Sequence, residues 1–108
     1  MLAANEKSRV IASPVLTADD LDVAVTAVLA ASPYAHLVMH KTGHGLDIHE
    51  APQIMRGNLQ RLITGTVFTI EPGLYRTGDI GVQIEDNIVT TAEGSLCLTN
   101  FPRTLTLI

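Results

Sequence analysis

The sequence predicts an α+β fold in which one main helix precedes a mostly antiparallel sheet. Apolar residues recur every three or four positions between residues 17 and 31, which is typical of one face of a helix. Between residues 66 and 99 they alternate with polar residues instead, which is typical of strands. Turn signals such as Glu93-Gly94 separate the alternating segments, so short strands are expected to pair with their neighbours in sequence.

The helix is predicted over residues 17–31. Thr17 is a favourable N-cap, and two aspartates follow in the first turn, where the helix dipole favours negative charge. Leu21 and Val25 then fall on one face, and Pro33 ends the element.

The remaining chain is expected to comprise an irregular N-terminal segment and a sheet. Residues 1–16 show no clear period, so we expect an irregular segment there, followed by one partial domain over residues 17–108. Closely spaced apolar residues predict a helical turn at 59–63. Strands are expected at residues 66–71, 82–85, 87–91, 96–99 and 105–108.

Composition argues against several classes of function. The net charge is −4 and the seven Lys and Arg residues are scattered, so no nucleic-acid interface is expected, because that needs clustered positive charge. The longest stretch without a charged residue, 23–39, is interrupted by Pro33, and no membrane span is expected. Cys97 is the only cysteine, which fits a reducing cytoplasm.

Three histidines and two carboxylates fall within residues 40–50, in a chain with four histidines in all. His40 and His44 would share one face of a helix, but Gly43 and Gly45 argue against a helix here. The glycines instead favour a backbone held close to a ligand, with His44 projecting from a loop or an irregular strand.

Two downstream glutamates add metal-ligand chemistry. Glu71 ends an alternating segment at Pro72, and Glu85 shares a strand face with Gln83. Two carboxylates at strand ends beside a histidine suit a hard divalent ion such as Mn²⁺ better than structural zinc. Carboxylates that bridge two such ions activate a water between them.

Together these motifs resemble the pita-bread (creatinase/aminopeptidase) metallopeptidase family, and most closely its Xaa-Pro dipeptidase (prolidase) and aminopeptidase P branch. The family patterns H-R-T-G-H-G-x-G-L-x-x-H-E, G-x-x-F-T-I-E-P-G-x-Y and G-x-R-x-E-D are matched by residues 40–50, 65–75 and 81–86. The resemblance runs from about Thr17 to the C-terminus. It implies the C-terminal half of a pita-bread domain, with a curved sheet.

The resemblance also implies roles for five residues. His44, Glu71 and Glu85 match metal ligands, while His40 and His49 match histidines that contact substrate and steady the tetrahedral intermediate. The implied activity is hydrolysis of Xaa-Pro dipeptides or removal of N-terminal residues before proline. The implied cofactor is a divalent metal, Mn²⁺ or Co²⁺, with two ions in the intact family.

Three departures from the family set the expectations for this chain. No segment with the family's two aspartate ligands precedes Thr17, His44 and His49 are five apart rather than seven, and Gln83 replaces a common arginine. With half of the carboxylates, the chain is expected to hold at most one ion weakly. We therefore expect a truncated or degenerate copy that is inactive by itself.

Other readings of the same motifs remain open. A non-catalytic pseudo-peptidase would serve as a binding or dimerisation module, and a creatinase-like hydrolase would work without metal. An N-terminal half-domain or a homodimer partner could also complete the site around a peptide or dipeptide substrate.

Overall fold

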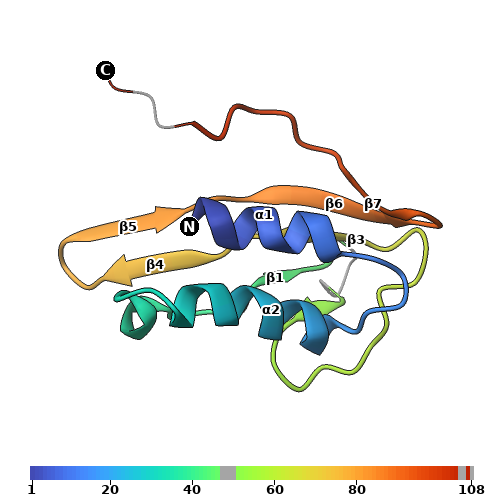
Figure 1. Cartoon of the computed structure of the whole chain (residues 1–108), viewed down its shortest axis with the longest axis horizontal. Helices are drawn as coiled ribbons and strands as arrows, with labels where there is room; N and C mark the ends of the chain where they lie inside the picture. Colours follow the sequence, from blue (N-terminus) through green and yellow to red (C-terminus); the bar gives the residue numbers. More distant parts are fainter. Residues whose placement is uncertain (47–50, 105–106, 108) are drawn as a thin grey trace.

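The computed structural model describes residues 1–46, 51–104 and 107, and in them two α-helices pack against antiparallel strands (Figure 1). The predicted α+β class is thereby confirmed. The helices are α1 (Leu2–Ile11) and α2 (Ala18–Ala30), followed by the short 3₁₀ helix η1 (Ala35–Leu37). The strands are β1 (Gly43–His44), β2 (Gln53–Ile54), β3 (Val67–Ile70), β4 (Gly73–Arg76), β5 (Ile80–Gln83), β6 (Asp86–Thr91) and β7 (Gly94–Cys97).

Helix α2 confirms the predicted helix and its cap. The Thr17 hydroxyl accepts a hydrogen bond from the Asp20 amide at 3.1 Å, and the Asp20 carboxylate accepts one from the Thr17 amide at 2.9 Å. Leu21, Val25 and Leu29 form the buried stripe. Neither helix among the described residues is long and apolar enough to cross a membrane.

The irregular segment expected at residues 1–16 is a wrong prediction, because α1 occupies most of it. The buried side of α1 is made by Ala4, Asn5 and Ser8, which give no apolar period that the sequence could reveal. Ser8 donates to the Asn5 main-chain oxygen at 2.7 Å. Helix α1 packs beside α2 and β7, so tertiary contacts stabilise it, and the described residues form two main helices instead of one.

The strands form three small antiparallel sheets: β3-β6-β7, β1-β2 and β4-β5. The helical turn expected at 59–63 is wrong. Arg61 instead bridges to Thr17, and the buried Leu62 donates its amide to the Leu16 oxygen at 2.9 Å. Most of the strand expected at 105–108 lies outside the described residues.

The core lies between the helices and the strands β3 and β6. Its buried members are Ala12, Ala18, Leu21, Ile54, Leu62, Phe68, Ile70 and Ile88. Strand β3 is buried on both faces, because Phe68 and Ile70 face the core while Thr69 is covered by the segment around β1. Glu71, the residue that follows β3, is therefore attached to a strand that is packed on both faces.

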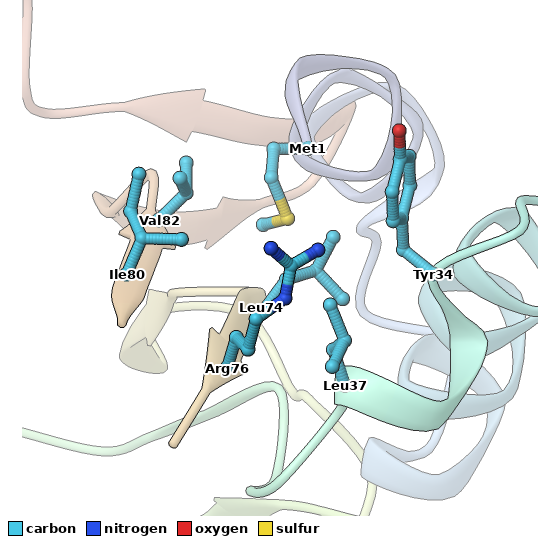
Figure 2. A pocket seen from close by; sticks show the side chains of 7 residues that line it. All are labelled: Met1, Tyr34, Leu37, Leu74, Arg76, Ile80 and Val82. Atoms are coloured by element: carbon cyan, nitrogen blue, oxygen red, sulfur yellow. The ribbon is translucent and has the colours of Figure 1, made fainter. Parts of the chain in front are cut away.

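The β4-β5 hairpin has two unlike faces. Leu74 lies opposite Val82 on one face, where they line an apolar hollow of about 280 Å³ together with Met1, Tyr34, Leu37, Arg76 and Ile80 (Figure 2). Tyr75 and Gln83 belong to the other face. The hairpin therefore separates this apolar hollow from the polar residues described next.

Candidate active site

His44 projects from β1 with its Nε2 atom directed toward Glu71. Its amide donates to the Thr69 hydroxyl at 3.0 Å, which fixes the backbone against β3. Its Nδ1 atom lies 2.8 Å from the Gly45 oxygen. A carbonyl oxygen can only accept, so Nδ1 donates to it, and Nε2 is the ring nitrogen left to face a ligand.

Glu71 follows directly after β3 and faces this histidine. Its amide donates to the Thr42 oxygen at 2.7 Å, so the backbone is fixed by the histidine loop itself. The Thr42 hydroxyl in turn donates to the buried Asp22 of α2 at 2.7 Å. Glu71 Oε1 lies 3.5 Å from His44 Nε2, so the predicted pair does converge.

Glu85 completes the group of predicted metal ligands. Its pKa is raised above the usual 4.5 by desolvation and by the neighbouring Glu71 carboxylate, while His44 acts in the opposite direction. Two carboxylates held beside each other repel unless a cation or a proton lies between them. His44, Glu71 and Glu85 are therefore close enough to act on one another electrostatically.

The described residues contain no three His, Cys, Asp or Glu side chains already arranged as a metal site. The donor set nevertheless fits a divalent ion. Two atoms bound to one ion at about 2.1 Å and at a right angle lie about 3 Å apart. The 3.5 Å between His44 Nε2 and Glu71 Oε1 is near that value, and the crowded carboxylates supply negative charge.

His40 lies at the exposed rim of the site. Its Nδ1 atom is 2.6 Å from the Lys41 oxygen, and its Nε2 atom is 3.0 Å from the Tyr75 hydroxyl. The ring centroids of His40 and Tyr75 are 5.3 Å apart. His49, the other predicted substrate contact, lies outside the described residues.

Tyr75 and two glycines are site residues that the sequence reasoning did not single out. The Tyr75 hydroxyl donates to Gln83 Oε1 at 2.6 Å. A Cβ atom on Gly73 would lie 2.6 Å from the Tyr75 hydroxyl oxygen, and one on Gly81 would lie 2.6 Å from its ring. The sequence does contain a sign of this contact, because a glycine inside a strand often marks a place where another group packs closely against the backbone.

Gly43 and Gly45 also serve close packing within the protein itself. An added Cβ on Gly43 would collide with the main-chain oxygen of Thr69, and one on Gly45 with that of Ala51. The neighbours are protein backbone, so these glycines hold the histidine loop against its own scaffold.

A cavity of about 570 Å³ opens beside the carboxylates. It is lined by Met1, Leu2, Val82, Gln83, Ile84, Glu85, Asp86, Phe101, Pro102, Arg103 and Thr104. Glu85, a candidate metal ligand, and its neighbour Gln83 therefore line a space that is large enough for a small molecule.

Solved structures of peptidases share this fold. A prolidase from Pyrococcus horikoshii matches with a TM-score of 0.90 and 38% identity, covering 97% of this chain and 31% of that one. An X-Pro aminopeptidase from Thermotoga maritima matches with a TM-score of 0.89 and 35% identity, covering 95% and 30%. The predicted pita-bread fold is confirmed by these likenesses.

Curated relatives give the same picture. An Xaa-Pro dipeptidase from Pyrococcus horikoshii is 38% identical over 107 residues, which cover 97% of this chain and 30% of the relative. A probable dipeptidase, PepE, from Mycobacterium tuberculosis is 39% identical over 97 residues, covering 88% and 26%. The chain therefore spans less than a third of the length of these relatives.

The match to a family model extends the likeness beyond the motifs. The model of metallopeptidase family M24 matches residues 1–92, which includes α1. The resemblance therefore begins at residue 1 and not at Thr17 as the motifs indicated. Because the match covers most of the chain, this protein belongs to metallopeptidase family M24.

Proposed function

We propose that this chain forms the C-terminal part of a divalent-metal peptidase site that hydrolyses Xaa-Pro dipeptides or removes an N-terminal residue before proline. The observation that carries the proposal is the approach of His44 Nε2 to Glu71 Oε1 at 3.5 Å, with Glu85 beside them. The substrate class is supported by relatives described as an Xaa-Pro dipeptidase and an X-Pro aminopeptidase.

His44, Glu71 and Glu85 would hold the ion, with Mn²⁺ or Co²⁺ the best match to one imidazole and two carboxylates. When bound, the ion supplies Lewis acidity and lowers the pKa of a coordinated water. His44 would contribute Nε2, because its Nδ1–H donates a hydrogen bond to the Gly45 oxygen. The two glutamates would contribute negative charge, and each raises the cost of ionising the other until a cation binds.

The remaining two predicted residues would act on the substrate. His40 sits at the rim, where an imidazole N–H can donate to the carbonyl oxygen as negative charge develops on it. His49 receives the same role from its place in the motif. Neither residue is needed to hold the ion in this proposal.

The charge balance limits what the chain does alone. Two divalent ions carry four positive charges, and Glu71 and Glu85 supply two negative ones. We therefore propose that the isolated chain binds one ion weakly and does not turn over substrate. Carboxylates from an N-terminal half-domain or from a second copy would complete the site, in the reducing cytoplasm that fits the single Cys97.

Calorimetric titration of Mn²⁺ into the chain tests the metal site. We expect one weak site, and we expect Glu71→Gln, Glu85→Gln and His44→Ala each to lower the affinity by more than about tenfold. The matched control is Glu93→Gln in the β6-β7 turn, an exposed glutamate that should change nothing. Equal affinity in all five proteins would overturn the proposed site.

Hydrolysis of Ala-Pro, followed with added Mn²⁺ or Co²⁺, tests the second half of the proposal. The isolated chain should give no turnover above the metal-ion blank. Metal-dependent turnover that Glu71→Ala abolishes would contradict the claim that carboxylates are missing, while upholding the peptidase function.

A further inference from the structure

The side chain of Gln83 engages one oxygen of a candidate metal ligand. Gln83 Nε2 donates to Glu71 Oε2 at 3.0 Å, while the other carboxylate oxygen, Oε1, lies 3.5 Å from His44 Nε2. One oxygen of Glu71 is therefore held by the amide, and the other faces the histidine. Gln83 has no part in the proposed function, and in the family pattern an arginine is common at its position.

The register of the β4-β5 hairpin explains how Gln83 reaches Glu71. Gln83 lies opposite Gly73, so its diagonal neighbours across the hairpin are the residues two positions before and after that glycine, Glu71 and Tyr75. A Cβ on Gly73 would lie 2.6 Å from the Tyr75 hydroxyl oxygen. The missing side chain of Gly73 therefore leaves the space in which the glutamine amide meets both neighbours.

Tyr75 sets which end of the amide faces the carboxylate. The Tyr75 hydroxyl donates to Gln83 Oε1 at 2.6 Å, and an amide oxygen can only accept. The NH₂ group of Gln83 is therefore turned toward Glu71. The Tyr75 ring is packed against Gly81, its cross-strand partner, where an added Cβ would lie 2.6 Å from the ring. The amide is thus held at both ends.

The charge of the donor matters because the candidate site has few carboxylates. Glu71 and Glu85 lie close enough to repel each other, and their negative charges would attract a divalent ion. An arginine at position 83 would also donate to Glu71, but its fixed positive charge would repel the same ion. A glutamine amide is neutral, so it holds the carboxylate without offsetting its charge.

We propose that Gln83 is a positioning residue for metal binding, which holds the Glu71 carboxylate with Oε1 toward His44 and leaves its negative charge to the ion. The proposal rests on the proposed function, in which His44 and Glu71 bind the ion. Its two parts can be separated by experiment. The orientation is lost when the donor is removed, and the charge is offset when an arginine is introduced.

Electron paramagnetic resonance of free Mn²⁺, titrated with the full chain, measures the affinity. Gln83→Leu removes the donor and should weaken Mn²⁺ binding by about tenfold, because residues that hydrogen-bond to metal ligands contribute on this scale. The matched control is Gln60→Leu, which makes the same change at another exposed glutamine and should leave the affinity unchanged.

Gln83→Arg separates charge from orientation. It keeps a donor to Glu71 and adds a positive charge, so it should also weaken Mn²⁺ binding. That loss should shrink in high salt, because salt screens the interaction between exposed charges. The loss in Gln83→Leu should persist in high salt, because it comes from the geometry of the carboxylate.

A double-mutant cycle with Tyr75→Phe gives a result that a merely structural role would not give. Tyr75→Phe alone should weaken Mn²⁺ binding, because the amide of Gln83 is then free to rotate. The same change made in the Gln83→Leu background should have no further effect, because no amide is left to orient. Circular dichroism shows whether each variant is folded.

The hydrogen bond itself can be followed without metal. In ¹⁵N–¹H spectra of the metal-free chain, one side-chain amide proton of Gln83 should be shifted downfield by its carboxylate acceptor. Glu71→Ala should return it to the range of the exposed Gln60 amide. An unshifted Gln83 amide in wild type would overturn the proposal and leave the proposed function untouched.

The affinity measurements also distinguish the two proposals. Equal Mn²⁺ affinity in wild type and in folded Gln83→Leu would overturn the role of Gln83 alone, and so would fully additive losses in the cycle with Tyr75→Phe. Absence of Mn²⁺ binding to wild type would overturn the proposed metal site, and the role of Gln83 with it.

Discussion

Two adjacent carboxylates, Glu85 and Asp86, lie in opposite electrostatic environments. Asp86 is buried, and the Arg103 guanidinium donates two hydrogen bonds to its carboxylate, at 2.8 Å and 2.7 Å. Glu85 is exposed and stands near another carboxylate, Glu71. The pKa of Asp86 is lowered to about 2, whereas that of Glu85 is raised. The comparison shows how one motif can supply both a closed structural ion pair and an open site.

The difference follows from the course of the chain. Asp86 begins β6, opposite Ile70 of β3, and its side chain reaches Arg103 and Thr99 of the C-terminal segment. Consecutive side chains of extended chain point to opposite sides, so Glu85 is turned toward Glu71. Asp86 is paired with the Arg103 guanidinium, while Glu85 stands beside a second carboxylate. A structural carboxylate is neutralised by the fold, and a ligand carboxylate is left for an ion.

The largest effect on stability is expected from breaking the ion pair between Asp86 and Arg103. Asp86→Ala should lower the free energy of unfolding by about 2–3 kcal/mol, because Arg103 and Thr99 lose their acceptor in a buried place. Urea denaturation at neutral pH measures it. Glu85→Ala, one residue away, is the control and should not destabilise the protein. Equal losses in both variants would abolish the distinction drawn between the two carboxylates.

Acid should remove the Asp86 contribution selectively. Burial by itself would raise the pKa of Asp86, but hydrogen bonds from Arg103 and Thr99 outweigh it and lower the pKa from 3.8 to about 2. A lowered pKa in the folded state means that the stabilisation is complete above pH 3.8 and is lost as the pH falls toward 2.

The comparison protein for this acid effect is Asp86→Asn, which keeps the shape and removes the charge. Its urea midpoint should lie below that of wild type at pH 6, and the gap should close as the pH approaches 2. A gap that stays constant over this range would mean that the Asp86 charge contributes nothing to stability.

The sequence predicts those parts of the fold that local chemistry dictates. Thr17 and Asp20 form a reciprocal cap, and any chain with this pattern before an apolar period starts a helix there. Helix α1 has no such signal, because Ala4 and Ser8 are buried through contacts with distant elements. Leu62 is likewise buried by pairing of its segment with residue 16, which no local period can reveal.

The candidate site divides in the same way. The motif order predicts that His44 and Glu71 belong to one site, and the structure brings the two side chains to 3.5 Å. The links through Tyr75 and Gln83 depend on cross-strand register and on the space left by Gly81. Those features exist only once β4 and β5 are paired. Sequence reasoning therefore found the candidate ligands and missed the hydrogen bonds that orient them.

The smallest effect is expected from removing the repulsion between Glu85 and Glu71. Desolvation and Glu71 raise the pKa of Glu85 above 4.5, so the folded state binds a proton more tightly than the unfolded chain does. Stability therefore falls as the pH rises above 4.5 and stays reduced beyond the raised pKa. Glu85→Gln removes this cost and should be more stable than wild type at pH 7, by less than about 1 kcal/mol because the group is exposed. At pH 4 the two proteins should unfold at the same urea concentration.

Mn²⁺ should reverse the order of stability at pH 7 and make wild type the more stable protein, since an ion that binds folded wild type more tightly stabilises it more. A Glu85→Gln variant less stable than wild type at pH 7 without metal would place Glu85 among the structural carboxylates, beside Asp86.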